Sequence, residues 1–181
     1  MRTKAILVSI GLITILLNCS NGSKDLLNDF KNGDSKLFVC PVHILANQES
    51  SYSTELSEKI VEYINENEYA TASITELCPP ANNEWRANEA IMLTKSIKLS
   101  IEYVKGLNLS EDTYVLYPEF LKSGQNVSIK AVHYCLLSNK GEVVIRGMLN
   151  SKWKEFQAVN PKTDEDCVAV FINGFEEHMK E

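Results

Sequence analysis

Cysteine and histidine side chains lie close together in two short stretches of this sequence, and these residue types are the best suited to chemistry. His133 and Cys135 are two residues apart, so on a strand both would point to the same face. Cys40 and His43 are three apart and would face opposite sides of a regular strand. Two cysteines and two histidines could form a zinc site, and a cysteine beside a histidine could form a nucleophile–base pair. Because the second spacing breaks that arrangement, we expect no metal site and no catalytic residue.

The cysteines also permit disulfide bonds, at positions Cys40, Cys78, Cys135 and Cys167. In an oxidising compartment four cysteines invite two bridges, with three alternative pairings that the sequence does not distinguish. The alternative is that some of them are small buried hydrophobic side chains. We expect no cofactor, because the chain has no glycine-rich phosphate loop, no Gly-x-Ser-x-Gly turn and no His-Glu-x-x-His sequence.

The fifth cysteine, Cys19, closes a segment that has the features of an export signal. Arg2 and Lys4 supply positive charge, and residues 5–17 form an almost wholly apolar run. A helix of that length spans about 20 Å, short of a hydrocarbon core of roughly 30 Å, so a signal peptide fits better than a membrane span. The alternatives are a buried N-terminal helix with an incidental cysteine and a eukaryotic signal peptide.

The end of this segment, Leu-Leu-Asn-Cys at 16–19, resembles the lipobox of bacterial lipoproteins, in which an apolar residue stands three places before an invariant cysteine. The family prefers Gly, Ala or Ser where Asn18 stands. The resemblance implies removal of residues 1–18, a lipid on Cys19 and attachment to a membrane of the bacterial cell envelope. Ser20 is similar to an outer-membrane sorting signal, so the outer membrane is favoured over the inner membrane.

The rest of the chain is expected to be a tether followed by one domain. Residues 19–35 are rich in Gly, Ser, Asn and Asp and predict a flexible tether, whereas residues 36–181 suffice for a single core. The full chain has a net charge of −6, and loss of Arg2 and Lys4 leaves 16 basic against 24 acidic residues. This acidic balance argues against nucleic acid as a partner, because nucleic-acid binding needs basic surface.

Alternating strands and helices must position these side chains. Strands are predicted by β-branched and aromatic content over residues 36–45, 70–77, 113–120, 127–137 and 142–149. Helices are predicted by apolar periodicity over residues 54–67, 84–106 and 164–179. Residues 46–53 are polar and predict a loop. The order β-α-β-α-β-β-β-α predicts an α/β (α+β) fold, a single mixed sheet of about five strands with helices packed on it.

The start of this domain resembles a group of small envelope domains. A strand with Phe-Val-Cys-Pro at 38–41 leads into a helix carrying Leu56 and Ile60, and a strand with Ile74 follows. This order is similar to the N-terminal domain of TolB and to the CsgG and LpoB envelope lipoproteins. It covers about the first third of the mature chain. The resemblance implies a non-catalytic assembly module and carries over no individual functional residue.

Three aromatic residues are candidates for contact with a partner. Trp85 lies beside an arginine at the start of the long helix, and Trp153 and Phe156 follow the hairpin. Tryptophan is enriched among the interface residues that contribute most to the binding free energy. The alternative is that these side chains pack against the domain itself. We therefore expect a lipid-anchored envelope protein that is not an enzyme and that binds another envelope protein. A small-ligand-binding lipoprotein and a Cys/His-dependent enzyme are the other hypotheses.

Overall fold

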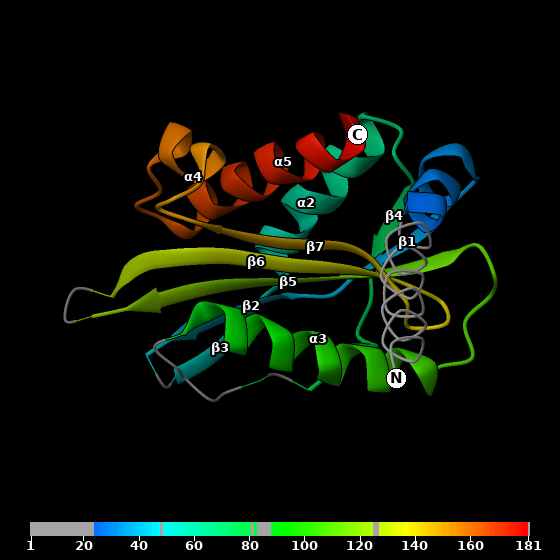
Figure 1. Cartoon of the computed structure of the whole chain (residues 1–181), viewed down its shortest axis with the longest axis horizontal. Helices are drawn as coiled ribbons and strands as arrows, with labels where there is room; N and C mark the ends of the chain where they lie inside the picture. The colour runs from blue at the N-terminus through cyan, green and yellow to red at the C-terminus, as the bar shows by residue number, and fades with distance from the viewer. Residues whose placement is uncertain (1–23, 48, 81, 83–87, 125–126, 181) are drawn as a thin grey trace, which may run out of the picture.

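The computed structural model describes residues 24–47, 49–80, 82, 88–124 and 127–180, and across these ranges a single mixed sheet lies between two layers of helices (Figure 1). The predicted α/β class with a single mixed sheet is confirmed. The sheet has seven strands where about five were expected. Within the described ranges, no helix is both long enough and apolar enough to cross a membrane.

The elements follow one another in a simple order. The strands are β1 Lys36–Val39, β2 Val42–Ala46, β3 Glu49–Ser53, β4 Thr71–Ile74, β5 Thr113–Ser123, β6 Ser128–Ser138 and β7 Val143–Asn150. The helices are a first one over 24–32, then α2 Thr54–Glu66, α3 Glu89–Lys105, α4 Lys154–Val159 and α5 Asp164–Lys180.

Strand β5 is the centre of the sheet. On one side it pairs antiparallel with β6, and β7 follows β6. On the other side β5 pairs with two short parallel strands, one after the other along its length. Strand β1 lies beside its first half and β2 beside its second half. Strand β4 extends the sheet beyond β1, and β3 extends it beyond β2. Both ends of this side therefore finish in a short edge strand.

The single strand expected over 36–45 is two strands, and Pro41 explains the break. Proline has no N–H to donate to a sheet ladder. The Cys40 N–H still donates to the Leu116 carbonyl at 2.9 Å, but the Val42 N–H donates to Ser57 Oγ of α2 at 2.8 Å. The chain thus leaves β5 for two residues and then rejoins it as β2.

Strand β3 occupies a stretch that the sequence predicted as a loop. Its residues Glu-Ser-Ser-Tyr-Ser are almost all exposed, so no apolar alternation marks it. It forms because Asn47 takes a left-handed conformation, with φ of 57°, and turns the chain back along β2. Backbone pairing with β2, rather than burial of side chains, stabilises this strand.

The two faces of the sheet carry separate apolar layers. Helices α2, α5 and 24–32 cover one face, and α3 alone covers the other (Figure 1). The larger cluster lies on the first face and includes Ile60, Leu116, Phe171 and Phe175. The side under α3 holds two smaller clusters. The gap between these two clusters is where the polar residues described below are found.

The folded domain includes residues that the sequence assigned to a flexible tether. Residues 24–32 form a helix in which Leu27 is buried and Phe30 is 0% exposed. The Phe30 ring lies 5.0 Å from that of Tyr114 and 6.5 Å from that of Phe175, measured between centroids. The domain therefore begins before residue 36, because two apolar side chains three residues apart attach this polar segment to the core.

The other predicted elements differ less from the structure. The helices expected over 54–67 and 164–179 are confirmed as α2 and α5, and α2 begins where Ser53 Oγ accepts a hydrogen bond from the Leu56 N–H. The hairpin is confirmed as β6 and β7, with Gly141 at φ of +71° in its turn. The helix expected over 84–106 is α3, which begins at Glu89 after its N-cap Asn88. Residues 84–87 of that prediction lie outside the described residues. The short helix α4 was not predicted.

Candidate functional site

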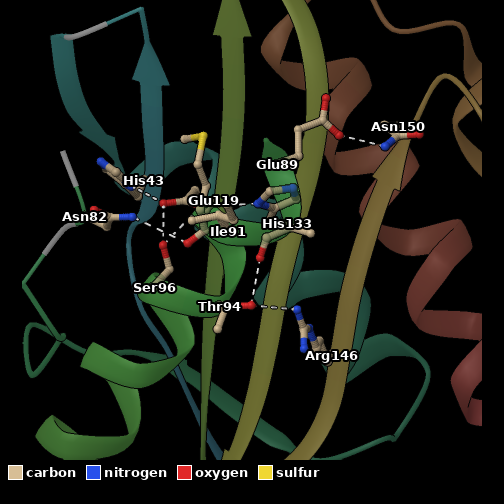
Figure 2. Close-up of polar contacts among 12 residues, drawn as sticks. His43, Asn82, Glu89, Ile91, Thr94, Ser96, Glu119, His133, Arg146 and Asn150 are labelled. Atoms are coloured by element: carbon tan, nitrogen blue, oxygen red, sulfur yellow. Dashed lines mark hydrogen bonds and ion pairs between the residues drawn. The ribbon is translucent and has the colours of Figure 1, made fainter. Parts of the chain in front are cut away.

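A buried polar cluster interrupts the apolar layer between the sheet and α3 (Figure 2). Its centre is Glu119 on β5, which is 1% exposed, flanked by His43 on β2 and His133 on β6, both 0% exposed. The register places His43 opposite Glu119 and Glu119 opposite His133. Residues opposite one another in a sheet share a face, so all three side chains point toward α3. There Ser96 meets them.

Glu119 accepts hydrogen bonds from both layers. His43 Nδ1 lies 3.0 Å from Oε1, and the Ser96 hydroxyl donates to Oε1 at 3.2 Å and Oε2 at 3.4 Å. His133 Nδ1 is 3.5 Å from Oε2, without hydrogen-bond geometry. Burial raises the pKa of Glu119, but its contacts with His133 and His43 outweigh burial and hold the pKa below its ordinary value. The carboxyl group is therefore ionised at neutral pH.

The other ring nitrogen of His43 makes a hydrogen bond that links the buried carboxylate, through the imidazole, to the protein surface. His43 Nε2 lies 2.9 Å from Oγ of Ser50, an exposed residue of β3. The carboxylate of Glu119 only accepts, so neutral His43 carries its proton on Nδ1 and Nε2 accepts from the Ser50 hydroxyl. A serine on a histidine that a buried carboxylate orients is an arrangement in which histidine can act as a general base.

Sequence reasoning singled out His43 and His133 but missed Glu119 and Ser50, because the members of this cluster are far apart along the chain. Ser50 lies 7 residues from His43, in a stretch predicted as a loop, and Glu119 lies 76 residues from His43. Their proximity requires the β2–β3 hairpin and the parallel pairing of β2 with β5. One signal was present: Glu119 is the one charged residue in the run from Tyr114 to Leu121, whose other residues are apolar or aromatic, and a buried charge needs a partner.

The cysteines are not arranged for thiol catalysis. Cys135 shares the sheet face of His133, but burial raises its pKa to about 12. Contact with Cys78, together with burial, also raises the pKa of Cys40. A nucleophilic thiol needs a lowered pKa, so these two thiols are unreactive. Among the residues that the structure describes, no group of three or more His, Cys, Asp or Glu side chains is placed to hold a metal ion.

The disulfides considered from the sequence are not formed in the structure, in which Cys40, Cys78, Cys135 and Cys167 are all free thiols. Three of them, Cys40, Cys78 and Cys135, belong to the apolar cluster under α3. Cys167 is buried on α5, in the cluster on the opposite face of the sheet. A bridge from Cys167 to any of the others would have to cross the sheet, which rules out two bridges among the four.

The aromatic residues proposed for partner contact have different positions. Trp85 and the lipidation candidate Cys19 lie outside the described residues. Trp153 is 48% exposed, as a contact residue requires. The prediction for Phe156 is wrong, because α4 turns its ring into the core, where it is only 8% exposed.

Trp153 borders a cavity of about 260 Å³ between β7, the start of α4 and the C-terminal half of α5. Two buried polar atoms in its lining, Tyr134 Oη and Glu155 Oε2, have no hydrogen-bond partner. Burial, with a contribution from Glu155, raises the pKa of Tyr134, so its phenol stays protonated and can donate. An exposed indole beside an unpaired donor and an unpaired acceptor suits a partner side chain or a small polar ligand.

No model of a known protein family matches this chain, and a search of curated proteins finds no significant match.

Proposed function

We propose that this protein is a lipid-anchored lipoprotein of the bacterial cell envelope whose α/β domain binds another envelope protein. The observation that carries the anchor is Cys19, which directly follows a positive start at Arg2 and Lys4 and the apolar run over 5–17. The order of these features is that of a signal peptide. The acidic balance of the mature chain supports a lipid, rather than basic side chains, as the attachment to the membrane.

The anchor and the folded domain lie close together in the chain. Residue 24, which is already helical, follows Cys19 by only five residues. Five residues extend at most about 17 Å, at roughly 3.5 Å per residue. A lipid on Cys19 would therefore keep the domain near the membrane surface. The partner we propose is accordingly a membrane protein or a protein held close to the same membrane.

The surface that we propose for this partner is centred on Trp153. Tryptophan side chains often dominate the binding energy of an interface, especially beside a pocket from which water can be excluded. Here the half-exposed indole stands at the edge of the cavity that contains Tyr134 Oη and Glu155 Oε2. A partner donor and a partner acceptor would pair these two atoms on binding.

Intact mass spectrometry of the protein extracted from membranes tests the anchor. We expect a mass equal to residues 19–181 plus a diacylglyceryl group, and in Cys19→Ala a loss of both the lipid and membrane attachment. Ser20→Ala is the matched control, because it changes the neighbouring residue and keeps the thiol. A full-length or unlipidated wild-type mass would disprove the anchor.

Affinity purification in mild detergent tests the Trp153 surface. We expect wild-type protein to recover the same envelope protein reproducibly, and Trp153→Ala to recover at least about tenfold less, since loss of a dominant anchor costs about 2 kcal/mol or more. Lys152→Ala, an exposed neighbour, is the control and should recover as much as wild type. Equal recovery by Trp153→Ala would overturn this surface and favour the second candidate, a small ligand in the cavity.

A further inference from the structure

We propose that Ser50 is the nucleophile of an ester-hydrolysing centre in which His43 is the general base and Glu119 positions His43. This activity goes beyond the proposed binding role and uses different residues. Its substrate class is a small carboxylic ester that approaches the edge of the sheet at β3.

The geometry of the three residues carries the proposal. Ser50 Oγ lies 2.9 Å from His43 Nε2, and His43 Nδ1 lies 3.0 Å from Glu119 Oε1. Both distances are within the range in which a base takes a proton and a carboxylate orients a histidine. Glu119 and His43 are buried, whereas Ser50 is exposed. Of these three residues, Ser50 is thus the one that a dissolved substrate can reach.

The position of Ser50 on an edge strand supplies the second requirement, a donor for the developing oxyanion. Among the described strands, β3 pairs only with β2. Successive N–H groups along a strand point to opposite sides, so either Ser50 or Ser51 directs its N–H toward the open edge. An N–H beside the nucleophile is the type of donor that stabilises an acyl-transfer intermediate.

The surroundings of Ser50 favour a small ester. Tyr52 lies two residues further along β3 and is half-exposed, with its ring centroid 5.3 Å from that of His43. Alternate residues of a strand share a face, so the Tyr52 ring stands beside the Ser50 hydroxyl. It offers an apolar surface to the acyl group of the substrate.

The reaction balances without a cofactor. The Ser50 Oγ–H proton passes to His43 Nε2 as Oγ bonds to the ester carbonyl carbon. The bond from that carbon to the alcohol oxygen then breaks, and His43 returns the proton to the departing alcohol. Water attacks the acyl-serine and gives a proton to His43. The carboxylic acid leaves as Ser50 Oγ takes that proton back.

A purely structural role for the cluster is the competing explanation, and it predicts that Ser50 has the reactivity of any surface hydroxyl. The full chain, purified in detergent, is treated with a fluorophosphonate probe, and the adduct is located by peptide mass spectrometry. We expect one adduct per chain, on Ser50, and none in Ser50→Ala. Ser151→Ala, at an exposed serine outside the proposed centre, is the control and should be labelled as wild type. Absence of an adduct on Ser50 would overturn the proposal.

Hydrolysis of p-nitrophenyl acetate gives an independent readout. We expect Ser50→Ala to reduce the rate at least about 100-fold relative to Ser151→Ala, because the nucleophile is lost. Equal rates in the two variants would also overturn the proposal, because other surface groups would then account for the reaction. Both side chains are exposed, so neither substitution should alter folding, and the melting temperature checks this.

The positioning role of Glu119 must be tested by a measurement that does not change merely because the variant is less stable. In Glu119→Gln we expect labelling of Ser50 to slow about tenfold or more at temperatures where circular dichroism shows the variant folded. Glu119→Asp should restore part of the rate, because it restores the carboxylate. Wild-type labelling rates in folded Glu119→Gln would remove Glu119 from the proposal.

Discussion

Phe30→Ala is expected to destabilise the domain by about 3–5 kcal/mol, the usual cost of truncating a fully buried phenylalanine. The Phe30 ring is 0% exposed and makes edge contacts with Tyr114 and Phe175, so its removal leaves a cavity between the first helix, β5 and α5. Chemical denaturation followed by circular dichroism measures the change.

The same experiment decides between a tether and a folded helix over residues 24–32. Asn28→Ala, on the exposed side of that helix, is the control and should change the free energy of unfolding by less than about 0.5 kcal/mol. If residues 24–32 were a flexible tether, Phe30→Ala would be as neutral as this control. A neutral Phe30→Ala would place the start of the domain at residue 36, as the sequence predicted.

Local patterns in the sequence were sufficient for the elements that bury one regular apolar face. Helices α2 and α5 were predicted from stripes that include Ile60 and Phe171, together with polar residues suited to helix starts. The β6–β7 hairpin was predicted from two apolar runs around Gly141. These features depend on residues within a few positions of one another, so the sequence contains all the information they need.

Elements that depend on distant partners could not be predicted in this way. The residues of β3 are polar, and only pairing with β2 makes them a strand. The first helix has two buried residues in a polar context, and their burial depends on Phe175, at the other end of the chain. The site shows the same limitation, because Ser50, His43 and Glu119 converge only after β2 has paired with both β3 and β5.

Glu119→Ala should destabilise the protein by about 3–5 kcal/mol at pH 7. The substitution leaves the His43 Nδ1–H and the Ser96 hydroxyl without their buried acceptor, and each such loss costs roughly 1–3 kcal/mol. Urea denaturation at pH 7 measures the effect. Glu58→Ala, at an exposed position of α2, is the control and should be nearly neutral.

The dependence on pH distinguishes loss of this carboxylate from simple loss of packing. Since folding lowers the pKa of Glu119 below its ordinary value of 4.5, the ionised carboxylate contributes its full stabilisation above that value. The contribution disappears as the pH falls through the lower pKa of the folded state. The difference in unfolding free energy between wild type and Glu119→Ala should therefore be largest at neutral pH and shrink below pH 4.5. A difference that stayed constant across this range would mean that Glu119 stabilises the fold through its volume rather than its charge.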